Sequence, residues 1–388
     1  MTLSDMPLSS PLAPRIWFTD TKMSPEKPRT IALVRDVETE TWGSGQIHCQ
    51  SDIRGLLTHI RTVVAGPAGR GALQGIAQVA SPTVDASTGG GEGLSVVLGV
   101  ERPLGRVLVD KLLSDSKKVR AVYLERQASE EVRIPDAQTV IIDPSEAFNV
   151  TEACTGARVV YDCYEPNYSV WKWAWPRVTS NVVFAAIEVS ATLVFASHLL
   201  KSESENERQE AEVLRANNSR LVRTVIARMP QLIGVRVVNP LWKIIYDSVL
   251  AGKKAHWVGD PDVPRSLLDV EDAATAMVDL AETPGLAGKA WGVASPDSIT
   301  GRQFIELAFK AVNRKPEIGT WGRGIVITGG LLATDAREVL KMPYDYHVPF
   351  QLNGKDFADA LPTFHFTPPE VSLAKGIGWY KSSLSAKE

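Results

Sequence analysis

The regular alternation of short apolar segments with amphipathic ones, from Leu94 onward, constrains the fold of this chain most strongly. Residues 95–99 are almost wholly apolar, which is typical of a strand buried on both faces of a parallel sheet. Apolar residues at helical spacing follow over 104–112, and residues 119–124 return to strand character. Strands that alternate with helices predict right-handed crossovers, and therefore a doubly wound parallel sheet of the α/β class.

The same pattern also suggests how the chain is divided. Residues 1–91 lack it and end in a Gly-rich stretch, so we interpret them as an N-terminal extension of unknown role. We expect a Rossmann domain over 92–388, with a smaller C-terminal cap built mainly from 235–388. Further strands are expected at 139–142, 158–161 and 191–195, and helices of the later part at 244–250, 270–281 and 300–312.

Composition excludes several classes of function. The 42 Lys and Arg nearly balance the 45 Asp and Glu, so no nucleic-acid partner is expected. The three cysteines and six histidines lack metal-type spacing, which predicts no metal site. The longest apolar stretch is too short to span a membrane and no secretion signal is evident, so we expect a cytoplasmic protein without a membrane partner.

Several segments together resemble one known family. They include a strand followed by a Gly-bearing loop, an Arg228-Met-Pro230 segment, and a helix that opens after Asp269. In this order they resemble the extended and atypical short-chain dehydrogenase/reductases, in particular the NAD-dependent epimerase/dehydratase-like and NmrA-like branches. The resemblance covers about residues 94–381 and implies a Rossmann fold with a dinucleotide cofactor, NAD or NADP.

The loop that would receive the cofactor departs from the family pattern. Gly99 and Gly105 match the first and third glycines, but Arg102 replaces the middle one. Glycine there lets the backbone approach the pyrophosphate. Arg102 therefore either clamps a phosphate or occupies the cleft.

Two further positions bear on the cofactor. After the second strand, Glu125 would accept from a ribose 2′-hydroxyl, whereas Arg126 would favour a 2′-phosphate, so the choice between NAD and NADP stays open. The resemblance also places Pro230 at the cofactor.

The family's catalytic Tyr and Lys are not evident. Alignment of the corresponding helix puts Ser204 and Arg208 at their positions, and no tyrosine occurs between Tyr168 and Tyr246. A serine hydroxyl, with its much higher pKa, does not replace a phenol as an acid at neutral pH. We therefore do not expect the usual redox mechanism.

Other side chains at the strand ends are candidates for chemistry. Ser197 and His198 follow the fifth strand, and His198 would carry a proton near neutral pH. Tyr164, after the fourth strand, would face the nicotinamide ribose if a cofactor is bound. These three are the predicted catalytic residues.

A predicted substrate pocket adjoins them. It comprises Glu165, Trp171, Trp173 and Trp175. If extended, the three indoles form one apolar wall suited to an aromatic or polycyclic substrate, whereas a helix would spread them around its axis. Alternatively, they anchor the cap or an oligomer interface.

Three hypotheses for function follow. The first is a non-redox step on a small organic substrate, such as isomerisation, cyclisation or dehydration, with NAD(P) as a bound scaffold. The second is a reductase with an unusual acid. The third is a catalytically silent binding or assembly subunit, in a homo-oligomer or a larger complex.

Overall fold

The computed structural model describes most of the chain after residue 92. Described are residues 15–17, 32–34, 93–124, 133–165, 171–198, 203–321 and 346–386. For 15–17, 32–34, 171–173, 198 and 203–206 the description covers the backbone alone. In the N-terminal extension, β1 (Arg15–Trp17) pairs antiparallel with β2 (Ala32–Val34).

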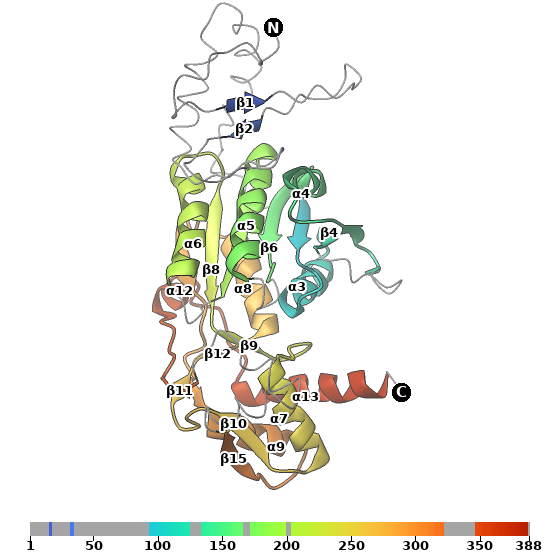
Figure 1. The fold of residues 1–388 in the computed structure, drawn as a ribbon, viewed down its shortest axis with the longest axis vertical. Helices are drawn as coiled ribbons and strands as arrows, with labels where there is room; N and C mark the ends of the chain where they lie inside the picture. The colour runs from blue at the N-terminus through green and yellow to red at the C-terminus, as the bar shows by residue number, and fades with distance from the viewer. Residues whose placement is uncertain are drawn as a thin grey trace, which may run out of the picture.

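A seven-stranded, all-parallel sheet forms the centre of the molecule (Figure 1). Its order is β13-β8-β7-β6-β3-β4-β5. β3 therefore lies inside the sheet, with β4 and β5 on one side of it and the later strands on the other. This arrangement confirms the predicted doubly wound α/β class. The strands are β3 (Leu94–Leu98), β4 (Lys118–Tyr123), β5 (Gln138–Ile141), β6 (Ala157–Asp162), β7 (Thr192–His198), β8 (Thr224–Met229) and β13 (Ala290–Gly292).

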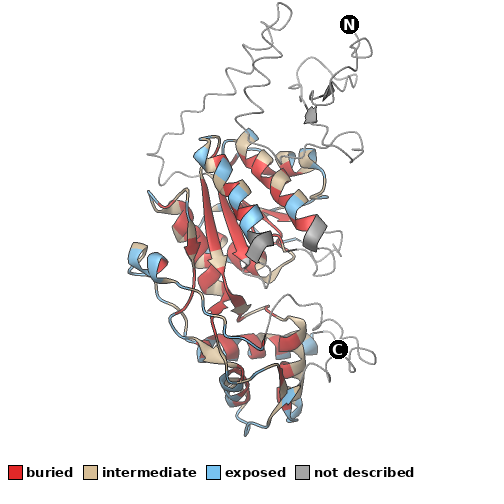
Figure 2. Cartoon of the chain, turned by 60° about the vertical axis from the view of Figure 1, so that its left-hand side comes forward, coloured by how far each residue is buried: buried red, intermediate tan, exposed pale blue. Residues whose placement is uncertain are grey.

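Helices cover both faces of the sheet. The apolar cluster on one face contains Val97 and side chains of α3 (Pro103–Ser114) and α8 (Val270–Glu282). The cluster on the other contains Leu98 and side chains of α4 (Ala147–Cys154), α5 (Trp171–Glu188) and α6 (Glu203–Asn218). Neighbouring residues of β3 serve opposite faces because strand side chains alternate. Figure 2 shows this buried layer running along the sheet.

The lower part of Figure 1 is a second, smaller lobe, attached beyond the carboxyl ends of the strands. Its helices are α7 (Pro240–Ala251), α9 (Gly301–Ala311) and α13 (Pro369–Ser385), while α12 (Lys355–Ala360) lies beside β13. Three strand pairs join them: β9 (Gln231–Ile233) with β12 (Leu267–Asp269), β10 (Ala255–Val258) with β15 (Ile318–Trp321), and β11 (Pro264–Arg265) with β14 (Ile299–Thr300). Stacked rings fill its core, with Trp242 and Phe304 centroids 4.2 Å apart.

Side-chain caps fix where three of these helices begin. Asn239 Oδ1 accepts from the Trp242 backbone N–H at 2.8 Å at the start of α7. Asp269 caps α8 through the N–H groups of Glu271 and Asp272, and Thr300 with Gln303 forms a capping box on α9. Such caps satisfy N–H groups that the helix itself leaves unbonded. The described helices include none that is both long and apolar enough for a bilayer crossing.

Candidate functional site at the switch point of the sheet

The strand order reverses between β3 and β6, and ligands of doubly wound sheets bind beyond the strands at this point. The loops that follow these two strands touch. Gly99 has φ +81°, and a Cβ there would lie 2.9 Å from the backbone carbonyl of Cys163. Gly99 is therefore required both for the turn and for the close approach of the two loops.

The second glycine of the loop sets the contact between strand and helix. A Cβ on Gly105 would lie 2.3 Å from the carbonyl oxygen of Gly99, a distance that no side chain tolerates. Pro103 is the first residue of α3, and the capping residue Arg102 makes no side-chain cap bond. The free N–H groups of this helix start are therefore directed at the edge where a phosphate group would bind.

Arg102 fits the loop at the level of the backbone. Its φ of −93° and ψ of 151° are extended values that any residue adopts, and its N–H donates to Gly99 O at 3.1 Å. Its side chain is partly buried. The backbone of the loop and the helix start thus fits a dinucleotide pyrophosphate.

Glu101 is a residue of this site that the sequence analysis did not single out. Its Oε2 accepts the backbone N–H of Leu124 at 3.1 Å, which brings a carboxylate to the carboxyl end of β4. The available signal was an acidic residue inside a Gly-bearing loop. Glu125 and Arg126, the two residues predicted for this end of the strand, lie outside the described residues.

Asp162 was also missed, although it ends β6 at the switch point. It is 2% exposed, and its Oδ1 accepts the Tyr164 N–H at 3.1 Å. Burial raises the pKa of this carboxyl to about 7, and the hydrogen bond from Tyr164 only partly offsets that effect. A carboxyl that titrates near neutrality therefore lies under the candidate site.

Ser197 is held inside the protein. Its Oγ donates to Glu210 Oε1 at 2.7 Å, and the same carboxylate accepts from Arg228 Nε at 2.9 Å. Glu210 is almost fully buried, whereas the Arg228 side chain is 41% exposed. The hydroxyl proton of Ser197 is thus directed at Glu210, which links β7, α6 and β8.

Tyr164, which we expected at the nicotinamide ribose, is largely buried. It is 6% exposed and belongs to the apolar cluster that contains Leu98 and Trp175, on the side of α4 and α5. The ring gains more from this apolar layer than from a polar strand end. It is therefore a core residue.

The indole segment is helical, so the single wall that an extended segment would form is absent. Trp171, Trp173 and Trp175 all lie in α5, the arrangement that spreads them around the axis. Trp175 is buried in the core, and the side chains of the other two lie outside the described residues.

Three other predicted site residues, Glu165, His198 and Pro230, lie at or after the ends of β6, β7 and β8. β6 and β7 are neighbours, with Asp162 opposite Phe195, so Glu165, which comes after β6, and His198, the last residue of β7, belong to the same edge of the sheet. Glu165 is partly exposed, and the side chain of His198 is outside the description. Pro230 is buried between β8 and β9.

The alignment positions of the Tyr and Lys pair lie in the first turns of α6. Arg208 is exposed there, and the Ser204 side chain is not among those described. Within the described ranges, no three His, Cys, Asp or Glu side chains form a group that could hold a metal ion.

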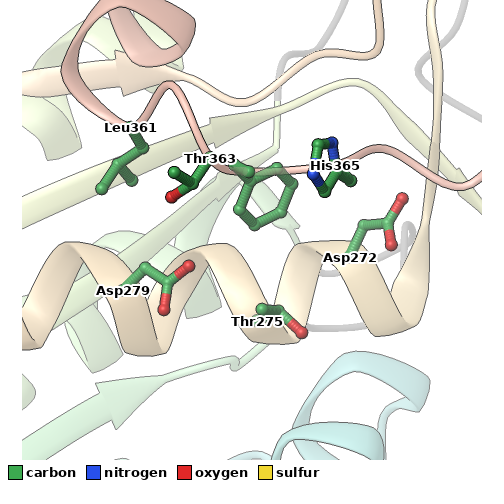
Figure 3. A pocket seen from close by; sticks show the side chains of 7 residues that line it. Asp272, Thr275, Asp279, Leu361, Thr363 and His365 are labelled. Atoms are coloured by element: carbon green, nitrogen blue, oxygen red, sulfur yellow. The ribbon is translucent and has the colours of Figure 1, made fainter.

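A separate cavity of about 210 Å³ lies between α8 and residues 361–365 (Figure 3). Asp272 and Asp279 project from one side of α8 toward this segment. Asp272 also accepts the backbone N–H of Thr367 at 2.6 Å and its hydroxyl at 2.8 Å, which fixes the segment to the helix. None of the lining residues belongs to the loops at the switch point, so this cavity is not part of the candidate site.

Solved structures of epimerases and dehydratases share this fold. The Bordetella bronchiseptica enzyme WbmH, in complex with NAD+, is 17% identical, with a TM-score of 0.58 over 75% of this chain and 99% of that one. Thermus thermophilus UDP-glucose 4-epimerase, in complex with NAD, is 15% identical, with a TM-score of 0.59 over 75% of this chain and 99% of that one. Bacillus anthracis dTDP-glucose 4,6-dehydratase, in complex with NAD, is 13% identical, with a TM-score of 0.60 over 76% of this chain and 98% of that one.

The sequence itself matches no family model and no curated protein. At these identities the structural likeness establishes the fold. The predicted Rossmann-type fold is therefore confirmed, and these solved enzymes share it.

Proposed function

We propose that the crevice at the switch point binds a nicotinamide dinucleotide, and that the protein converts a small organic substrate there by a non-redox step such as isomerisation or dehydration. The observation that carries the proposal is the packing of the β3–α3 loop. Gly99 and Gly105 bring the loop against β6 and α3, and the start of α3 is left without a side-chain cap. This is the geometry that accepts a pyrophosphate.

The chain's own groups at this edge suit proton transfer. Glu165 comes after β6 and His198 ends the adjacent β7, and a carboxylate with an imidazole can remove and return a proton. When bound, a nicotinamide dinucleotide would act as a scaffold that presents a flat ring beside the substrate. Arg102 would hold its phosphates.

Dinucleotide binding is tested on the full-length protein with NAD+, NADH and NADPH. A ligand that binds only the native state raises the melting temperature, and the fluorescence of the reduced forms reports binding directly. We expect a saturable shift with at least one of them, and weaker binding by Arg102→Ala. No shift with any dinucleotide at millimolar concentration would refute the proposal.

A second candidate function is a catalytically silent binding or assembly subunit. Two of the three predicted catalytic side chains have structural contacts, which favours this candidate. Ser197 donates a hydrogen bond to Glu210, and Tyr164 packs in an apolar cluster. This candidate predicts that the protein purifies in a larger complex and that His198→Ala leaves its biological activity intact. Loss of activity in that variant, with assembly unchanged, would support the enzyme instead.

A further inference from the structure

We infer that the smaller lobe carries a docking surface for an acidic segment of another protein. The surface consists of Lys253, Lys254, Arg314 and Lys315, which we call the basic patch. These residues come from two loops, 252–254 between α7 and β10 and 312–317 between α9 and β15. In Figure 1 these elements form the lower end of the molecule, away from the seven-stranded sheet. The inference is therefore independent of the proposed dinucleotide binding.

Parallel pairing of the following strands brings the two loops together. β10 and β15 run side by side with Ala255 opposite Ile318, so the loops that precede them lie at the same end of the pair. The Ala255 N–H donates to Glu317 O at 2.9 Å, which joins the loops directly. Arg314 reaches across to the end of α7, where a Cβ on Gly252 would clash with its guanidinium. The four cations therefore share one small area.

The positive charge of the basic patch is not neutralised within the protein. All four of its residues are exposed, and the described part of the chain forms no ion pair with any of them. Neighbouring lysines differ, since Lys243 pairs with Asp247 at 2.9 Å and Lys310 pairs with Glu370 at 2.8 Å. Glu317 is the only acidic residue in the two loops, which leaves them a formal charge of +3. Like charges held this close repel one another, and carboxylates from a partner relieve that repulsion.

The surroundings of the basic patch favour a short acidic segment over a long polyanion. The chain has a formal charge of −3 and the two loops carry +3, so the remaining residues sum to −6. A nucleic acid or an anionic membrane extends beyond two loops and would meet that negative remainder. Single-stranded nucleic acid also stacks its bases on open aromatic rings. Here His256 and Trp321, on the strands that follow the loops, stack on each other with centroids 4.8 Å apart.

The test measures the fluorescence anisotropy of a labelled oligo-glutamate peptide with the full-length protein at low ionic strength. The patch variant combines Lys254→Glu with Lys315→Glu, one change in each loop. Its matched control combines Lys118→Glu with Lys381→Glu, two exposed lysines elsewhere, so both variants have the same net charge. We expect the control to bind like the wild type and the patch variant to bind at least about tenfold more weakly. Added salt should weaken wild-type binding, because the contact joins exposed charges.

Footprinting of the wild type gives a second measurement that needs no variant. Its lysines are acetylated with and without the peptide, and the modified sites are read by mass spectrometry. We expect the peptide to protect Lys254 and Lys315 and to leave Lys118 as reactive as before. Unprotected Lys254 and Lys315 would overturn the inference, even if the patch variant failed to fold.

The binding experiment has three results that would also overturn the inference. The first is that the wild type does not bind the peptide, and the second is that the control loses as much affinity as the patch variant. The third is that the wild type binds a single-stranded oligonucleotide of equal charge, or vesicles of phosphatidylserine and phosphatidylcholine, as tightly as the peptide. That last result would assign the basic patch to nucleic acid or to a membrane surface instead.

Discussion

Among single residues, Asp162 carries the clearest conflict between charge and burial. The pKa of its carboxyl is about 7 in the folded protein, because burial disfavours the charged form, against an ordinary value of 3.8. Below pH 3.8 the folded and unfolded chains are both protonated, so the group does not change the free energy of unfolding. As the pH rises from 4 to 7, only the unfolded chain ionises, and the folded state loses stability progressively.

Asp162→Asn should remove that pH-dependent loss. The amide stays neutral and its oxygen can still accept the Tyr164 N–H, so we expect about 1–3 kcal/mol more stability than the wild type at pH 8. The gain should vanish by pH 4. Urea denaturation followed by circular dichroism between pH 4 and 8.5 measures it.

Glu212 complicates the comparison, because burial raises its pKa to about 7 as well. Part of the pH dependence should therefore persist in Asp162→Asn and disappear when Glu212→Gln is added. If the free energy of unfolding depended on pH in the same way for the wild type and Asp162→Asn, burial would not raise the pKa of Asp162, and the prediction would be wrong.

Among the elements, α6 is attached to the sheet by a buried polar contact. Glu210 accepts from Ser197 of β7 and from Arg228 of β8. Glu210→Ala leaves the guanidinium without its partner and the Ser197 hydroxyl without its acceptor. Because Arg228 is 41% exposed and water can solvate part of it, we expect a loss of about 2–3 kcal/mol, less than for a fully buried pair.

The matched control for that change is on the same helix. Glu207 is exposed, and Glu207→Ala should change the free energy of unfolding by no more than about 0.5 kcal/mol. Denaturant melts of both variants provide the comparison. A similar effect of the two substitutions would mean that the contact of Glu210 with the sheet contributes little.

The elements themselves were largely predictable, because hydrophobic periodicity reports burial directly. The strands near 95–99 and 158–161 and the helix at 270–281 lie where the pattern placed them, as β3, β6 and α8. The alternation of Trp171, Trp173 and Trp175 did not decide between strand and helix. The apolar run that continues to Ile187 makes the whole segment helical as α5.

The site was less predictable than the elements. The sequence indicated Gly99 and Gly105 as loop residues, because only glycine permits the close backbone approach that both positions show. The burial of Tyr164 could not be predicted, because the sequence does not show which way a side chain turns after its strand ends. Glu101 was missed for a related reason, since its contact with Leu124 joins residues that only the folded loop brings together.

For the whole molecule, the described residues place both apolar clusters at and beyond Val96. We therefore expect a chain of residues 92–388 to fold alone, with a melting temperature within a few degrees of the full-length protein and the same dinucleotide affinity. Differential scanning calorimetry and the NADH titration test this. An insoluble or unfolded product would show that the N-terminal extension is part of the folding unit.

The path of the chain between the two lobes has a mechanical consequence. After β8 the backbone enters the lower lobe for β9 to β12, returns to the sheet as α8 and β13, and then re-enters the lobe for α9 and β15. No single cut or pivot separates the two parts, because several connections would have to bend together. Any movement of one lobe relative to the other therefore requires these crossings to bend together about a common axis.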